Sequence, residues 1–157
     1  MKIVIVSDTH GSRKNIENVC ECNPDADMLI HLGDVEDDAD YIEAIFECPT
    51  HIVGGNNDFF SRLPREEEFE LEGHHIFITH GYYVSMGEAH LQEEARRRGA
   101  DIVMYGHTHV PALTIDADLV TLNPGSLTYP RQQGRQATYM VMKLEKGKQP
   151  EVELKTV

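Results

Sequence analysis

The chain contains little cysteine and few basic residues, and each shortage argues against a class of protein. Three cysteines among 157 residues, Cys20, Cys22 and Cys48, are an odd number without Cys-x-x-Cys spacing. This argues against a disulfide framework and a thiolate zinc site. Fourteen basic residues stand against 27 acidic ones, which gives a formal charge of −13. General binding to nucleic acid is therefore not expected, because it needs clustered lysine and arginine.

Long apolar runs are also absent. No run approaches the roughly 20 residues of a membrane span. The first six residues lead straight into Ser7 and Asp8, without the apolar segment and cleavage site of a signal peptide. We therefore expect a cytoplasmic protein that does not bind membranes. Because no linker or low-complexity tract divides the chain, we expect residues 1–157 to form a single domain.

Apolar runs of strand length alternate with helical segments through the first two thirds of the chain. Residues 2–6 and 28–32 predict strands, and residues 12–22 between them predict a crossover helix. Further expected elements are helices over 40–46 and from a Ser85/Glu88 capping box to Gly99, and strands over 51–53, 76–79 and 102–105. This alternation is typical of an α/β fold.

The last third of the chain changes pattern. Strands are expected at 112–115, 119–122, 137–144 and 152–157, with turns and no helices between them. We therefore expect a predominantly antiparallel second half, and two packed sheets formed by the two halves. Exposed strand edges there favour a homo-oligomer, whereas the acidic surface opposes close association.

Five short polar motifs follow apolar runs, in order along the chain. They are Asp8-Thr9-His10, Gly33-Asp34, Gly55-Asn56-Asn57-Asp58, His80-Gly81 and Gly106-His107-Thr108-His109. Each motif alone is typical of a turn or a helix cap. Together they supply seven nitrogen and oxygen ligands at the ends of expected strands, where ligands bind in α/β sheets. The conjunction predicts a site for two divalent metal ions.

The motif set resembles that of the calcineurin-like metallophosphoesterases, D-x-H, G-D, G-N-x-[DEH], H and G-H-x-H. The N-terminal start and the late Asn123-Pro124-Gly125-Ser126 are similar to the small bacterial and archaeal phosphodiesterases of that superfamily. The resemblance implies a four-layer α/β/β/α sandwich of two mixed sheets with a dinuclear centre. The implied ligands are Asp8, His10 and His109 for one ion, Asn56, His80 and His107 for the other, and Asp34 as the bridging carboxylate.

Such a centre explains the residue types chemically. Two cations about 4 Å apart hold a phosphate and acidify a bridging water, whose hydroxide attacks phosphorus directly. Imidazole and carboxylate ligands suit Mn, Fe, Ni or Zn better than Mg. We expect two divalent ions, with manganese first and nickel, iron or zinc as alternatives.

Three further residues are candidate catalytic groups. Many larger relatives carry histidine where this chain has Asn57, and an amide cannot act as a general acid. Asp58 either orients a nearby histidine or caps its own loop. Arg131 is a candidate for a bidentate phosphate contact, a role that Arg135 could equally take.

The leading interpretation is a metal-dependent phosphodiesterase acting on a small phosphoester. One alternative is a phosphomonoesterase with the same two ions. The other is a metal-free scaffold for protein interaction, as in the retromer subunit that resembles this group, although a scaffold does not need a complete ligand set. Five other histidines are expected to pack or lie at the surface: His31, His51, His74, His75 and His90.

Overall fold

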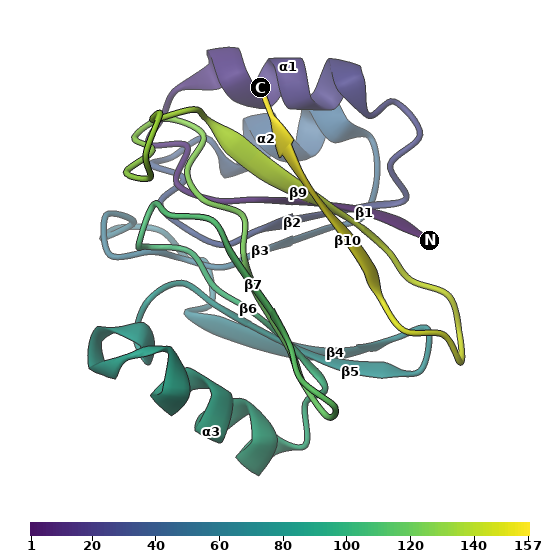
Figure 1. The fold of residues 1–157 in the computed structure, drawn as a ribbon. Helices are drawn as coiled ribbons and strands as arrows, with labels where there is room; N and C mark the ends of the chain where they lie inside the picture. Colours follow the sequence, from purple (N-terminus) through teal and green to yellow (C-terminus); the bar gives the residue numbers. More distant parts are fainter.

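The computed structural model describes all 157 residues and shows two sheets stacked between helices (Figure 1). The first sheet holds, in spatial order, β10 (Glu151–Thr156), β9 (Thr138–Lys143), β1 (Lys2–Val6), β2 (Met28–His31) and β3 (Thr50–Ile52). The second holds β4 (Glu66–Leu71), β5 (His74–Thr79), β6 (Ile102–Met104), β8 (Val120–Asn123) and β7 (Ala112–Ile115). Both sheets contain parallel and antiparallel pairs.

Helices cover the outer face of each sheet. Figure 1 shows α1 (Arg13–Cys22) and α2 (Ala39–Phe46) on the first sheet, and α3 (Glu88–Arg98) on the second. A short 3-10 helix, Val84–Met86, precedes α3. The four-layer sandwich expected from the sequence is therefore confirmed. None of the helices has the length and apolar character that a membrane crossing requires.

The alternation of side chains along β1 shows why the sheet is buried on both faces. Ile3 and Ile5 belong to the cluster between the two sheets, whereas Val4 and Val6 pack towards α1 and α2. All four are fully buried. Such continuous apolar strands are typical of parallel pairs with helices outside, and β1 pairs in parallel with β2.

The last four strands are predominantly antiparallel, as expected: β7 pairs with β8, and β9 pairs with both β10 and β1. Only β8 has a parallel neighbour, β6. The expectation that each half of the chain forms its own sheet is wrong, because β9 and β10 return to the first sheet. Five of the six residues of β9 are buried, so this strand needs neighbours on both sides. The two halves of the chain therefore interleave and do not form one sheet each.

The predicted capping box is also wrong. Ser85 lies inside the 3-10 helix, and its Oγ donates to the carbonyl of Tyr82. The helix α3 starts at Glu88 after Gly87, whose φ of +103° turns the chain sharply. Gly99, with φ of +77°, ends α3 as expected.

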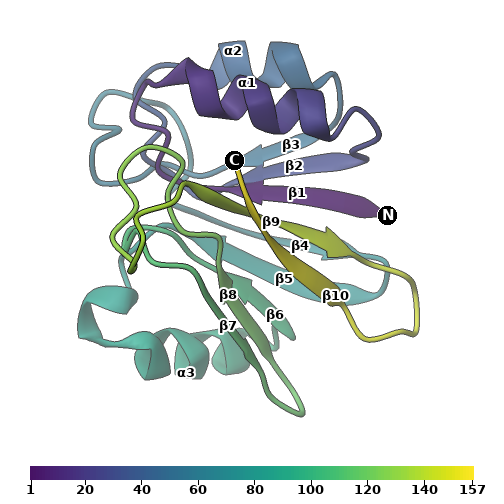
Figure 2. The ribbon, with the colours of Figure 1, turned by 45° about the horizontal axis from the view of Figure 1, so that its top comes forward.

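The carboxyl ends of the parallel strands meet at one edge of the sandwich. The loops that follow β1, β2, β3, β5 and β6 gather at this edge, on the left in Figures 1 and 2. These loops carry the five polar motifs. The topology thus brings segments distant in the sequence to one place.

Candidate metal centre

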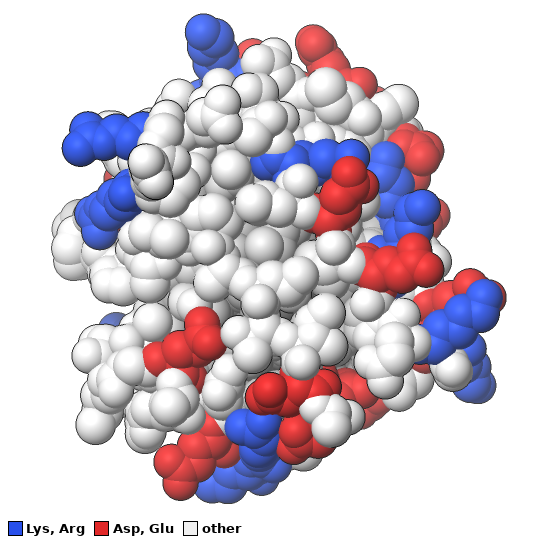
Figure 3. Space-filling view, in the orientation of Figure 1, with Lys and Arg blue, Asp and Glu red and all other residues white.

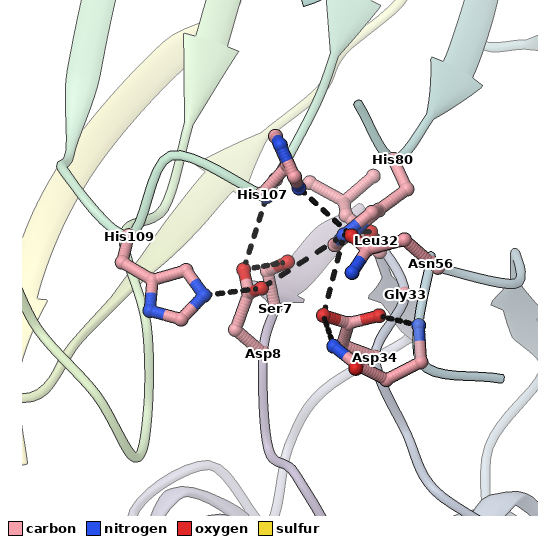
Figure 4. A network of polar contacts seen from close by, with 12 residues as sticks. Ser7, Asp8, Leu32, Gly33, Asp34, Asn56, His80, His107 and His109 are labelled. Carbon is pink, nitrogen blue, oxygen red and sulfur yellow. Dashed lines mark hydrogen bonds and ion pairs between the residues drawn. The ribbon is translucent and has the colours of Figure 1, made fainter. Parts of the chain in front are cut away.

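All seven predicted ligands meet at this edge, on five loops. Figure 4 shows the arrangement of all of them except His10. The first loop carries Asp8 and His10, the next two carry Asp34 and Asn56, His80 directly follows β5, and His107 and His109 follow β6. The structure therefore assembles the group that the motifs indicate. Their role as metal ligands stays a prediction.

One group of side chains forms a compact four-ligand cluster. The ligand atoms of Asp8, His10, Asp34 and His109 all lie within 4.8 Å of one another. His109 Nε2 is 3.0 Å from Asp8 Oδ1 and 3.5 Å from His10 Nε2. Carboxylate and imidazole donors at this spacing suit a divalent transition metal.

A second group lies beside the first. Asn56 Oδ1 is 3.1 Å from His80 Nε2 and 2.8 Å from His107 Nδ1. Asp34 joins the two groups, because its Oδ2 is 3.7 Å from His10 Nε2 and 3.5 Å from His80 Nε2. A single carboxylate oxygen is thus placed where two metal ions could share it.

An unpaired buried oxygen supports the fit of a metal ion. Asp8 Oδ1 is buried and makes no hydrogen bond, although His109 Nε2 lies 3.0 Å from it. Its partner oxygen Oδ2 accepts from Ser7 Oγ at 2.6 Å and from the backbone N–H of His107 at 3.2 Å. Buried polar atoms are nearly always paired, so the orphan oxygen fits a cation as its partner.

Outer hydrogen bonds set the orientation of three histidines. The acceptors are the Leu32 carbonyl for His80 (2.6 Å), the Tyr129 carbonyl for His109 (2.8 Å) and the Glu36 carboxylate for His10 (2.7 Å), each contacted through Nδ1. Donation from Nδ1–H leaves Nε2 with its lone pair towards the centre, as in metal-binding histidines. His107 differs, because its Nδ1 is the nitrogen near Asn56.

Both aspartates of the site favour the ionised form. Burial alone would raise the pKa of Asp34, but contacts with His80 and Asn57 hold it well below its ordinary value. Burial likewise raises the pKa of Asp8, and the contacts with His109, His80 and Ser7 outweigh that effect. Both carboxylates are therefore available as anionic ligands.

The surroundings of each histidine decide whether its pKa is raised or lowered. Burial would lower the pKa of His80, but Asp34 and Asp8 raise it above its ordinary value. The contact with Asp8 raises the pKa of His109, whereas burial lowers that of His107. Protons on His80 and His109 would have to leave when a metal ion binds.

Five of the seven predicted ligands have a left-handed backbone. The φ angles are +56° at Asp8, +47° at His10, +57° at Asp34, +67° at His107 and +59° at His109. This conformation costs a non-glycine residue roughly 1–3 kcal/mol and concentrates at functional sites. Aspartate and histidine are enriched among the few non-glycine residues with positive φ, but the motif letters alone do not predict this conformation.

Two glycines permit the close approach of the loops. A Cβ atom on Gly55 would overlap the carboxylate of Asp34, and one on Gly33 would lie 2.7 Å from His80 Nδ1. Both glycines belong to the motifs. Their function in this fold is therefore to leave room for Asp34 and His80.

The candidates Asn57 and Asp58 both form hydrogen bonds that position the loops of the site. Asn57 donates to Asp34 from its backbone N and from its side-chain amide. Asp58 accepts from the backbone N–H groups of Gly55 and Glu36, at 2.7 Å each, and from that of Val35. It contacts no histidine, so the structure favours the loop-capping alternative for Asp58.

Arg131 lines a cavity of about 190 Å³ beside the cluster. The other lining residues are His10, Asp34, Asn56, Asn57, His107, His109 and Tyr129. Tyr129 was not expected at the site, and its ring centroid lies 4.9 Å from that of His10. A single tyrosine in a loop gives no sequence signal for this position.

The loop at 123–126 supports the ligand loops from behind. Ser126 Oγ donates to the carbonyl of Asp8 at 3.1 Å, and Asn123 Nδ2 donates to that of Gly106 at 2.9 Å. Both side chains are fully buried. Ser7, which sequence reasoning missed, belongs to the same support because it bonds Asp8 directly.

Comparisons with known proteins agree with this geometry. The sequence model of the calcineurin-like phosphoesterase superfamily domain matches residues 1–147. A solved structure of a predicted phosphoesterase from Streptococcus pneumoniae is 30% identical, with a TM-score of 0.85 over 99% of this chain and 88% of that one. The phosphodiesterase YfcE of Escherichia coli is 28% identical over 88% of this chain and 85% of its own.

A third likeness concerns the fold alone. The structure of Vps29 from Entamoeba histolytica, solved with Zn²⁺, is 17% identical and superimposes with a TM-score of 0.79 over 99% of each chain. The sandwich architecture is thus common to proteins that differ widely in sequence. The family model, by contrast, covers nearly the whole chain and every motif. The chain therefore belongs to the calcineurin-like phosphoesterase superfamily.

Proposed function

We propose that this protein is a metal-dependent phosphodiesterase that hydrolyses small phosphoesters at a centre of two divalent ions. The observation that carries the proposal is the position of Asp34 Oδ2, 3.7 Å from His10 Nε2 and 3.5 Å from His80 Nε2. Membership of the superfamily and the similarity to YfcE support the reaction class. Because both sheets supply ligands, we infer that residues 1–157 act as one domain.

The residues divide into two ligand sets around one shared carboxylate. Asp8, His10 and His109 would hold one ion, Asn56, His80 and His107 the other, and Asp34 both. Manganese is the first candidate, with nickel, iron or zinc as alternatives, because all accept imidazole and carboxylate ligands. When bound, the ions would withdraw charge from phosphate oxygens and make water a better nucleophile.

The cavity beside the ligands is suited to a phosphate group. Neither serine nor cysteine lines it, and its histidines and Asp34 are the proposed metal ligands, so we propose hydrolysis without a covalent enzyme intermediate. Arg131 lies on the cavity wall, and its guanidinium can donate two parallel hydrogen bonds to phosphate oxygens. A chiral phosphorothioate diester would then react with inversion at phosphorus, and retention of configuration would contradict direct attack.

The chain offers no histidine as an acid at the position of Asn57. The amide of Asn57 can donate a hydrogen bond to a phosphate oxygen, but it cannot protonate a leaving group. Asp58 acts through the loop, where its carboxylate fixes three backbone N–H groups. We assign Asp58 as a positioning residue and Asn57 as a contact to both Asp34 and substrate.

The test is hydrolysis of bis(p-nitrophenyl) phosphate by chelator-treated protein, with and without added Mn²⁺. Wild type is compared with Asp34→Asn and His80→Ala, and with Lys143→Gln as a control. We expect turnover that depends on metal and is lost in the two site variants only. Faster turnover of p-nitrophenyl phosphate than of the diester would replace the diesterase by a monoesterase. Absence of both turnover and metal binding would favour a scaffold.

A further inference from the structure

A second cavity adjoins the metal pocket and has no role in the function proposed so far. It measures about 470 Å³ and is lined by Thr128, Tyr129, Pro130, Arg131 and Arg135, all from the loop between β8 and β9. Tyr129 and Arg131 line both cavities. A molecule with one phosphate at the metal pocket can therefore extend past these two residues into the second cavity, which we call the arginine cavity.

The two arginines of this cavity have no partners. Neither the side chain of Arg131 nor that of Arg135 is in an ion pair, and both residues are exposed. The helical arginines behave differently, since Arg13, Arg96, Arg97 and Arg98 all pair with carboxylates. Two like charges facing one cavity repel each other unless an anion lies between them.

The loop that lines the cavity contains no acidic residue. Residues 124–137 contain the two arginines and no aspartate or glutamate, although the whole chain carries a net charge of −13. Figure 3 shows blue side chains at the left margin, on the side where the β8–β9 loop projects in Figure 1. Most of the red side chains lie lower or to the right. The loop is thus a local positive region on an acidic protein.

Backbone hydrogen bonds fix both arginines in place. The N–H of Arg131 donates to the carbonyl of His109 at 2.9 Å, which ties the cavity to a predicted metal ligand. Arg135, with φ of +45°, follows Gly134 in a tight turn closed by its N–H on the carbonyl of Gln132. A left-handed arginine is an unfavourable conformation that the loop nevertheless adopts.

We propose that the arginine cavity is a subsite for a second phosphate group on one arm of the substrate. Arg135, together with the N–H groups of Arg131 that the reacting phosphate does not use, matches the double negative charge of a phosphate monoester, because one guanidinium carries five N–H donors and can contact two phosphates. The volume also admits the atoms that link this group to the reacting phosphate. The proposal rests on the proposed function for the identity of the substrate, and names a phosphodiester that also carries a terminal phosphate.

The subsite is tested first without any metal. In chelator-treated protein no metal ion holds a phosphate, so the part of phenyl phosphate binding that depends on Arg135 reports the arginine cavity. We expect binding by wild type and a loss of about ten- to hundredfold in affinity for Arg135→Gln, the usual effect of removing a charged hydrogen bond. Lys143→Gln removes the same charge from the opposite end of the first sheet and should bind as wild type does.

The comparison requires variants of Arg135 that fold, and Arg135→Gln is one of them. Arg135→Asn provides a second one, because asparagine tolerates a left-handed backbone, and thermal unfolding should match wild type for both variants. No binding of phenyl phosphate by wild type, or affinity equal to that of wild type in both folded Arg135 variants, would overturn the subsite.

A matched pair of substrates then connects the subsite to hydrolysis. The two are p-nitrophenyl esters of thymidine 5′-phosphate, one with and one without a 3′-phosphate, assayed with Mn²⁺. We expect wild type to prefer the phosphorylated ester by about tenfold or more in kcat/KM, and Arg135→Gln to lose this preference. Equal rates in wild type would overturn the subsite and leave the hydrolase intact. If phenyl phosphate binds but neither ester reacts, the proposed function fails and the anion site stands.

Discussion

Asp34 and Asn57 are joined by two hydrogen bonds, one to each carboxylate oxygen. The backbone N–H of Asn57 donates to Oδ1 at 2.8 Å, and the side-chain amide donates to Oδ2 at 2.6 Å. Asp34 Oδ2 is also the oxygen between the two histidine groups. The residue that departs from the pattern of larger relatives therefore orients the carboxylate on which the proposed centre depends.

Removing the amide of Asn57 should weaken metal binding. Asn57→Ala loses one of the two hydrogen bonds on Asp34, and loss of such an outer contact typically costs about ten- to hundredfold in metal affinity. Calorimetric titration with Mn²⁺ measures the change. Asn18→Ala, an exposed position on α1, is the matched control. An unchanged affinity in Asn57→Ala would show that the backbone N–H alone orients Asp34.

The lack of an acid at position 57 should appear in the choice of leaving group. We expect aryl phosphodiesters to react far faster than alkyl ones, because an alkoxide needs a proton to leave. Values of kcat/KM over a series of diesters measure this dependence. Asn57→His should raise the rate of alkyl esters relative to aryl esters. Equal rates across the series in wild type would contradict the assignment of Asn57.

Alanine substitution of Gly55 and of its neighbour Gly54 should affect Mn²⁺ affinity differently. A Cβ on Gly55 meets the Asp34 carboxylate, whereas on Gly54 the nearest atoms lie at 3.5 Å, an ordinary contact. We expect Gly55→Ala to lower Mn²⁺ affinity at least about tenfold, because Asp34 must move. Gly54→Ala should leave it close to that of wild type. Equal behaviour of the two variants in calorimetry would refute the steric argument.

Stability of the metal-free protein should rise with pH between about 4 and 6.5, partly because of His31. Burial lowers the pKa of this fully buried histidine from its ordinary value of 6.5 to about 4. Between these values the unfolded state binds a proton that the folded state does not, so acid favours unfolding, by up to roughly 3 kcal/mol. Urea unfolding at a series of pH values, with a chelator present, measures the free energy of unfolding.

A substitution identifies the residue responsible for this slope. His31→Asn should flatten the dependence on pH in that interval, and His90→Asn should preserve it. The histidines with raised pKa, His80 and His109, act in the opposite direction and at higher pH, because their stabilisation is lost as pH rises through the raised values. A slope that persists unchanged in His31→Asn would assign it to other groups.

The convergence of the seven predicted ligands was predictable from sequence because each lies in the loop that follows an apolar strand. Asp8 and His80 lie within two residues of buried strands, so local pattern and topology were enough to place them at one edge. The return of β9 to β1 was not predictable, because the pairing of Ile3 with Met142 joins residues from opposite ends of the chain. Alternation of apolar residues reports burial but does not name the neighbouring strand.

The local backbone conformation and the residues that support the ligands were also not predictable from the sequence. The left-handed φ of His107 and His109 could not be predicted from residue type, because histidine, although enriched in this conformation, adopts it in a small minority of cases. Ser7 supports the site through its sequence neighbour Asp8, whereas Tyr129 reaches His10 from a loop distant in the sequence. Ser85 matched a capping pattern, but the positive φ of Gly87 moved the start of α3 past it.

The number of metal ions bound per chain tests the central claim most directly. Native mass spectrometry of protein loaded with Mn²⁺ and freed of excess metal gives this number for wild type, His80→Ala and Asp34→Asn. We predict two ions in wild type, one in His80→Ala, because the cluster of Asp8, His10, Asp34 and His109 stays complete, and none held tightly in Asp34→Asn. A single ion in wild type, or two ions in Asp34→Asn, would contradict a centre built around a shared Asp34.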